Sequence, residues 1–261
     1  MTRERLLAAT IALVVLVALV GGWKLYVEAA DVSRFVLPPP EDVATATWEL
    51  LGEEGTWRHL RITLWEIVAG FGAASVFGII TGIAIGEVRV VERALSPFLI
   101  ALQVLPKVAI IPLLILWLGF GAGAKIVIAA IFAFFPVTAG TRAGIRSVER
   151  NHRDLATTLR ATRWQRLTQI DLPSSLPSIL TGMEVGIVLA TVGAIVAEYL
   201  SGSEGLGWLA TFYLNQLQVD ALFGVIVLMS ALGLALYAAV LALRRLLVPW
   251  HQSTLTDHPS A

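Results

Sequence analysis

The sequence predicts an all-α membrane protein that crosses the bilayer six times. Of its 261 residues, 57% are hydrophobic and only 15% are charged, and the mean hydropathy is +0.78. In soluble domains about a quarter of the residues are charged. The apolar residues gather in long runs separated by polar segments, and each run has roughly the length that a helix needs to cross a membrane. The fold class is therefore a polytopic helical membrane protein.

The first apolar run extends from Leu6 to Trp23. Its length favours a transmembrane helix, and the alternative is a cleaved signal peptide. The polar, acidic segment that follows contains a proline and two acids, which is a composition typical of a helix start. Residues 1–56 are thus expected to hold one transmembrane helix and a short helix outside the membrane, from about Glu41 to Leu51.

The second span, at about 62–86, carries glycines at intervals of four residues, namely Gly78, Gly82 and Gly86. Residues four apart lie on one helix face, and glycines there let another backbone approach closely. A contact with another helix of the same chain is the preferred interpretation. A contact with a second copy of the chain is the alternative.

The third span, at about 95–118, is interrupted by Pro106-Lys107 and by Pro112. Proline removes a backbone donor and kinks a helix, and in a membrane such breaks persist where the segment lines a cavity or packs on protein. Ionisable residues inside a membrane are functional candidates. The candidates for a translocation pathway are therefore Pro106, Lys107, Glu184 and Glu198. The alternative is that Lys107 forms a structural ion pair with Glu184 or Glu198.

The remaining spans are expected at about Ile126–Ala143, Ser174–Val196 and Leu222–Leu243, with a loop over 201–220 and a polar tail over 249–261. Between the fourth and fifth spans lies the longest polar segment, residues 151–177, which is rich in arginine. When six spans are assigned, 13 of the 19 Lys and Arg residues fall on one side of the membrane. Positive charge favours the cytoplasmic side, so this segment and both termini are expected there.

The polar segment 151–177 also carries a motif. Asp154-Leu155-Ala156, Arg160 and Ile170-x-Leu172-Pro173 have the spacing E-A-A-x3-G-x9-I-x-L-P. They resemble the EAA loop of the membrane subunits of binding-protein-dependent ABC importers. The alternative is an ordinary positive-inside loop.

The resemblance implies that segment 151–177 docks into a groove of an ATPase subunit. Its docking residues would be Arg153, Asp154, Leu155, Ala156, Leu159, Arg160, Ala161, Arg163 and Trp164, and Ile170, Leu172 and Pro173 would end the loop. Leu155 and Arg160 depart from the motif. Arg160 stands at the glycine position, where a left-handed backbone would cost a residue with a Cβ about 1–2 kcal/mol. Either the turn is made differently, or Arg160 makes a contact of its own.

Further segments resemble the nitrate, sulfonate and taurine branch of these permeases. They are the Leu37-Pro38-Pro39-Pro40 start, the proline-rich stretch 105–121, and Ala197-Glu198 followed by Gly205-Leu206-Gly207. The resemblance implies a permease core of the type I importer kind over 57–248, in the plasma membrane of a bacterium. The implied partners are ATPase subunits that hold ATP and Mg, an extracytoplasmic solute-binding protein, membrane lipid, and a second copy of the chain or a related chain.

The implied substrate is a small anion of the nitrate, sulfonate or taurine kind, and a pyrimidine vitamin precursor is the alternative within the family. A different alternative is an ion-coupled secondary transporter that uses Lys107, Glu184 and Glu198 as a relay. An enzyme is disfavoured, because the spans show no paired carboxylates, Ser-His arrangement or metal-ligand spacing, and the glycine-rich stretch 119–125 lacks the P-loop pattern. We expect no cofactor on this chain, no catalytic residue and no nucleic-acid partner.

Overall fold

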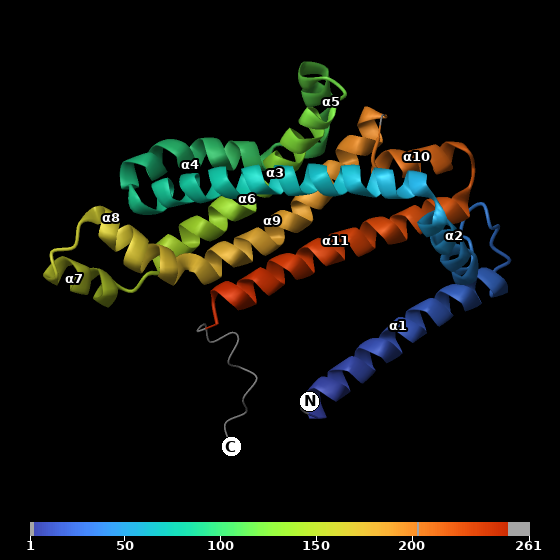
Figure 1. Cartoon of the computed structure of the whole chain (residues 1–261), viewed down its shortest axis with the longest axis horizontal. Helices are drawn as coiled ribbons and strands as arrows, with labels where there is room; N and C mark the ends of the chain where they lie inside the picture. The colour runs from blue at the N-terminus through green and yellow to red at the C-terminus, as the bar shows by residue number, and fades with distance from the viewer. Residues whose placement is uncertain (1–2, 203, 250–261) are drawn as a thin grey trace.

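The computed structural model describes residues 3–202 and 204–249, and no β-strand occurs among them. Helices follow one another along the whole described chain (Figure 1). They are α1 (Arg3–Ala29), α2 (Pro40–Gly52), α3 (Glu54–Glu87), α4 (Arg89–Val104), α5 (Lys107–Leu118), α6 (Ala122–Ser147), α7 (Arg150–Thr158), α8 (Arg163–Arg166), the π-helix η1 (Leu167–Asp171), α9 (Leu172–Ser201), α10 (Leu206–Asn215) and α11 (Val219–Leu247).

Five stretches of helix in the described residues are long and apolar enough to cross a membrane. They are 9–29 in α1, α3, α6, the continuous stretch from α8 through α9, and α11. The pair α4 and α5 passes the same test when taken together, although it bends by 95° at its break. The predicted class, an all-α membrane protein with up to six spans, is therefore confirmed.

The core of the molecule is formed by α3, α6 and α9, which run side by side along the long axis, with α11 against α9 (Figure 1). Helix α6 packs along α3 on one side and along α9 on the other. Small residues dominate this contact, for example Ala129 and Ala133 of α6 and Ala190 of α9, all fully buried. Small side chains let helix backbones approach closely in a membrane, where helix association depends on packing.

The glycine stripe of α3 explains part of this close approach. A Cβ added at Gly78, Gly82 or Gly86 would lie 3.0, 2.5 or 2.7 Å from the nearest side-chain atom of α6. The contacted residues, Val137, Thr141 and Ile145, follow the same interval of four. The stripe therefore contacts another helix of the same chain, and this face is not free to contact a second copy.

The third predicted span starts earlier and bends more sharply than the sequence indicated. Helix α4 begins at Arg89, and the chain turns through 95° at Leu105-Pro106 before α5 begins at Lys107. Proline has no N–H for the helix ladder and forces the preceding residue out of the helical region, and Leu105 has ψ 132°. Helix α5 consequently projects away from the bundle (Figure 1).

The segment 201–220 was predicted to be a loop, and this is wrong. Its middle forms α10, which packs through Leu206, Leu209 and Ala210 into a cluster with Val225 of α11 and Leu50 of α2. Apolar burial thus orders a helix that is too short to span a membrane. The expected short helix near Glu41–Leu51 is α2, whereas α1 makes few contacts with the bundle. Apart from Pro249, the predicted polar tail lies outside the described residues.

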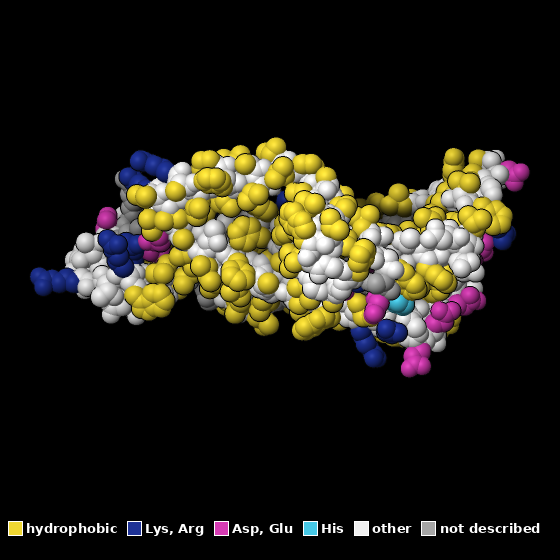
Figure 2. All heavy atoms as spheres, turned by 90° about the horizontal axis from the view of Figure 1, so that it is seen from above, with side chains coloured by type: hydrophobic (Ala, Val, Ile, Leu, Met, Phe, Trp, Pro, Cys, Tyr) yellow, Lys and Arg dark blue, Asp and Glu magenta, His cyan; other side chains and the backbone are white. Residues whose placement is uncertain are grey.

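Charged side chains separate along the long axis. In Figure 2 the middle of the visible face is mainly apolar, Lys and Arg gather at the end that carries α7 and α8, and Asp and Glu predominate at the opposite end. We call these the basic end and the acidic end. An apolar band between two polar ends is the surface that a bilayer requires.

Candidate functional site

The predicted docking segment forms the tip of the basic end (Figure 1). Helix α7 runs to Thr158, a turn follows, and α8 begins at Arg163. Thr162 caps α8 with a capping box, because its hydroxyl accepts from Gln165 N at 3.2 Å while Gln165 Oε1 accepts from Thr162 N at 2.9 Å. Helix α8 then continues through η1 into α9, so the tip is joined directly to a long helix of the core.

The turn between α7 and α8 has the form that the motif requires. Arg160 adopts a left-handed backbone with φ 52°. Its N–H donates to Thr157 O at 3.0 Å, and the N–H of Ala161 donates to Ala156 O at 2.9 Å, which together form a Schellman motif. The alternative of a differently made turn is therefore wrong. Arg160 occupies the glycine conformation itself.

This conformation leads to a prediction for the loop. Arg160→Gly is expected to stabilise the folded turn by about 1 kcal/mol, because glycine lacks the Cβ that clashes in the left-handed region. Hydrogen–deuterium exchange of the amides in the turn should slow about fivefold, which is the rate equivalent of that energy. Arg160→Ala keeps the Cβ and should exchange like the natural protein. Equal exchange rates in the glycine and alanine variants would show that the left-handed backbone of Arg160 is not strained by its Cβ.

The predicted docking residues differ in how they are placed. Leu159 and Trp164 are 71% and 72% exposed, which is unusual for large apolar side chains outside the apolar band. Arg163 and Asp154 are also exposed. Ala156 is only 2% exposed, so it supports the loop from within. Ala161 is half-buried, and the side chains of Arg153 and Leu155 lie outside the described part of the chain.

An ion-pair cluster that the sequence did not predict fixes the loop to the core. Arg166 of α8 donates through Nε to Asp171 Oδ2 at 3.0 Å and through Nη2 to Glu87 Oε2. Asp171 is fully buried, and Glu87 is the last residue of α3. Ile170 lies beside Asp171 in η1, and Leu172 and Pro173 form the first turn of α9. The loop end is therefore connected to both α9 and α3.

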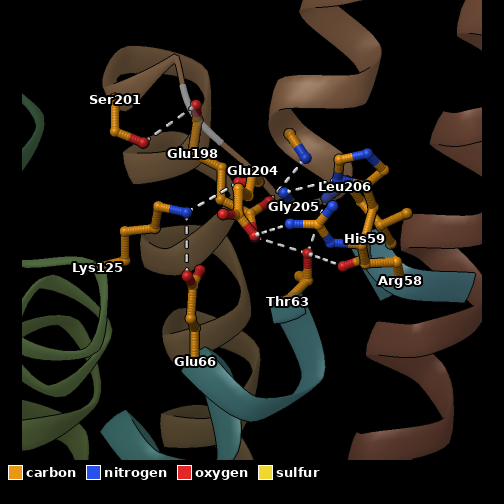
Figure 3. A network of polar contacts seen from close by, with 11 residues as sticks. Arg58, His59, Thr63, Glu66, Lys125, Glu198, Ser201, Glu204, Gly205 and Leu206 are labelled. Carbon is orange, nitrogen blue, oxygen red and sulfur yellow. Dashed lines mark hydrogen bonds and ion pairs between the residues drawn. The ribbon is translucent and has the colours of Figure 1, made fainter. Parts of the chain in front are cut away.

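A second polar cluster lies toward the acidic end of the bundle and joins α3, α6 and α9 (Figure 3). Lys125 Nζ of α6 lies 3.0 Å from Glu66 Oε1 of α3, and their side chains are 2% and 0% exposed. Lys125 Nζ also donates to the backbone oxygen of Glu204 at 2.8 Å. Lys125 ends the glycine-rich stretch 119–125, and it is buried as a link between α6 and α3.

Glu198 connects the start of α10 to the same cluster through hydrogen bonds (Figure 3). Its carboxylate accepts from Thr63 Oγ1 at 2.6 Å and from Gly207 N at 2.7 Å. A Cβ added at Gly205 would lie 1.9 Å from Glu198 Oε1, and Gly205 also has φ 108°. Glycine is therefore required there by both space and backbone conformation. This accounts physically for the Ala197-Glu198 and Gly205-Leu206-Gly207 motif.

The structure does not bring the predicted pathway residues together. Glu184 forms an ion pair with Arg244 of α11 at 3.0 Å, and Glu198 is bound to Thr63 and α10. Lys107 instead lies over the ring of Phe135, and its Nζ is 4.6 Å from the ring centroid. The proposed pairing of Lys107 with Glu184 or Glu198 is wrong, because these residues belong to different helix contacts. A relay through all three residues lacks continuity for the same reason.

Lys107, which follows Pro106 at the break between α4 and α5, faces a cavity of about 540 Å³ bounded by α3, α4, α5 and α6. Its other lining residues are apolar. Among the described residues, no group of three or more His, Cys, Asp and Glu side chains is arranged to hold a metal ion. The candidate site thus has three parts, which are the docking loop, the buried cluster near the acidic end, and the cavity between them.

Comparison with known proteins identifies relatives over most of the chain. Residues 74–251 match the model of the family described as binding-protein-dependent transport system inner membrane component. The formylaminopyrimidine transport permease protein ThiX of Halalkalibacterium halodurans is 34% identical over 218 residues, which cover 84% of this chain and 87% of that protein. The taurine transport system permease protein TauC of Escherichia coli is 31% identical over 247 residues, which cover 93% and 90%.

The fold also resembles a solved structure, an inward-facing conformation of the MetNI methionine ABC transporter. The TM-score is 0.59 and the sequence identity is 18%, and the likeness covers 75% of this chain and 99% of the compared chain. At this identity the likeness supports the fold alone.

Proposed function

The chain belongs to the family of binding-protein-dependent transport system inner membrane components, and we propose that it is the membrane-spanning permease subunit of an ATP-driven importer. The observation that carries the proposal is the loop over 151–177. It exposes Leu159 and Trp164 at its tip, and it is joined to the core through α9 and through the ion pairs of Arg166. A membrane protein that needed only to connect two spans would not require such a surface.

The proposed partners follow from this role. ATPase subunits dock on the basic end and carry ATP and Mg, so this chain itself is neither an ATPase nor the holder of a cofactor. A solute-binding protein delivers the solute at the acidic end. A second copy of the chain completes the pathway, and lipid surrounds the apolar band. The positive charge of the basic end supports a cytoplasmic position for the loop and for both termini, in the plasma membrane of a bacterium.

Movement can pass between the two ends through α3. Glu87 at one end of this helix binds Arg166 of the docking segment, and Thr63 near the other end binds Glu198. The 24 helical steps from Thr63 to Glu87 span about 36 Å at 1.5 Å per residue. A rigid helix that is hydrogen-bonded at both ends would shift the acidic end when the docked ATPases close. This is a means of coupling ATP hydrolysis to alternating access.

We propose that the solute is a small anion of the nitrate, sulfonate or taurine kind. The sulfonate group of the solute named for TauC and the positive charge of Lys107 in the cavity support a solute that carries an oxyanion group. A pyrimidine vitamin precursor is the second candidate, because ThiX is similar to this chain over a comparable length.

The proposed function is tested by uptake into liposomes. The complex purified from its native membrane is reconstituted together with its solute-binding protein, and solute uptake is measured with ATP enclosed or with an ion gradient alone. Uptake that depends on ATP supports the importer. Uptake by the isolated chain on an ion gradient without ATP would overturn the proposal in favour of a secondary transporter.

A further inference from the structure

The cavity beside Lys107 lies near the middle of α3 and α6, where the break between α4 and α5 meets them. Phe134 and Phe135 stand at the centre of α6, and Ala73, Ala74 and Phe77 lie close to the centre of α3. A hydrocarbon core is about 30 Å thick, so a site at this position lies near its middle, far from the lipid headgroups. A phosphate headgroup is therefore a poor occupant for it.

Lys107 is the only charged residue among the 16 that line this cavity. Its ammonium lies 4.6 Å from the ring centroid of Phe135 and 5.7 Å from that of Phe132. Within residues 3–202 and 204–249, it forms neither an ion pair nor a hydrogen bond. In contrast, Glu66, Glu184 and Glu198, the glutamates inside the spans, each have a polar or charged partner.

A lysine in this position has unused binding capacity. An ammonium group has three donors, and the faces of two aromatic rings stabilise its charge without accepting all three. Lys107 is half-buried, so its charge is partly removed from water without a hydrogen-bonded counter-charge, and a ligand that supplies an oxyanion would bind favourably. The rings hold the ammonium at the wall and leave its donors for that ligand.

The other walls restrict the body of the ligand. The lining holds Leu, Ile, Val, Ala and Phe side chains and no acidic residue. A ligand that carries its own ammonium group would bring a second positive charge next to Lys107 and find no carboxylate. An apolar body would displace water from apolar walls instead, which is favourable.

We propose that this cavity binds an organic anion with an apolar body and disfavours a zwitterion of the same size. The proposal rests on the proposed function, because it names the solute class that the pathway accepts. It separates two solutes that share a sulfonate group. Propanesulfonate and taurine have the same number of heavy atoms, and a methyl group in the first replaces the ammonium group of the second.

Equilibrium dialysis of the permease–ATPase complex in lipid nanodiscs, without the solute-binding protein, tests the proposal with these two radiolabelled compounds. We expect propanesulfonate to bind at least about tenfold more tightly than taurine, the usual scale for an uncompensated buried charge. Lys107→Met should lower the affinity for propanesulfonate at least about tenfold, whereas Lys107→Arg should retain most of it. Lys24→Met is the matched control, because it removes an exposed lysine of α1 and should leave binding unchanged.

The outcomes separate this proposal from the proposed function. Equal binding of the two compounds, no binding of either, or unchanged binding in Lys107→Met would overturn the proposal. The ATPase content of each preparation is measured in parallel. If the ATPase is present and the binding pattern fails, only the cavity proposal fails. If no ATPase accompanies the chain, the proposed function fails instead. Phe135→Leu provides a second variant should Lys107→Met not fold, and it should weaken propanesulfonate binding while the ammonium remains.

Discussion

Replacing Trp164 by alanine is expected to weaken binding of the ATPase subunit about thirtyfold and to reduce ATP-driven uptake accordingly. Trp164 is 72% exposed in α8, which directly follows the turn that holds exposed Leu159. Exposed aromatic residues of this kind often form the centre of a protein interface, and their truncation costs about 2 kcal/mol or more. That energy corresponds to the thirtyfold loss. Titration of the reconstituted permease with purified ATPase measures it.

The matched control is Trp48→Ala. Trp48 is 77% exposed on α2, at the opposite end of the molecule, so it removes the same side chain from a surface that the ATPase does not reach. This variant should bind the ATPase normally. Equal affinity of the Trp164 and Trp48 variants would contradict the assignment of the loop as the docking surface, provided that both variants insert into the membrane in normal amounts.

The second large effect is expected for Lys125→Met. Lys125 and Glu66 form a buried ion pair between α6 and α3, with 3.0 Å between Nζ and Oε1. Removing one partner leaves the other charge buried and uncompensated, which typically costs about 3–5 kcal/mol. The loss of the hydrogen bond to Glu204 O adds to it. The thermal midpoint of the purified chain in detergent should fall by about 6–20 °C.

Two further variants identify the cause of this loss. The double variant Glu66→Gln with Lys125→Met carries neither charge and should recover most of the lost midpoint. Lys24→Met removes an exposed ion pair, in which Lys24 Nζ lies 2.8 Å from Glu41 Oε1. This variant should leave the thermal midpoint nearly unchanged. If the double variant is no more stable than Lys125→Met alone, the ion pair is not the source of the stability.

The features that sequence could predict are those set by composition and local spacing. The apolar runs gave the all-α class and most of the spans, because a bilayer imposes length and hydrophobicity on each helix separately. The interval of four in Gly78, Gly82 and Gly86 predicted a close helix contact, since it follows from helix geometry alone. The spacing from Asp154 to Pro173 located the segment that forms α7, the turn at Arg160 and α8, and its docking role stays a prediction.

The features that sequence could not predict depend on which helices become neighbours. Glu66 and Lys125 lie 59 positions apart in the chain, and nothing local indicates that they meet. Pairing Lys107 with Glu184 or Glu198 was plausible by charge and failed because α9 presents these residues to Arg244 and to α10. Helix α10 was missed because its ten residues are too few for a span and are preceded by glycines. The left-handed Arg160 was missed because arginine rarely adopts that backbone.

Site-specific cross-linking in native membranes shows whether segment 151–177 contacts an ATPase. The chain contains no cysteine, so Leu159→Cys and Trp48→Cys each provide a single reactive thiol, at opposite ends of the molecule. We expect an adduct with a P-loop ATPase from position 159 and none from position 48. No ATPase adduct from position 159, or equal adducts from both positions, would contradict the docking loop and with it the proposed importer.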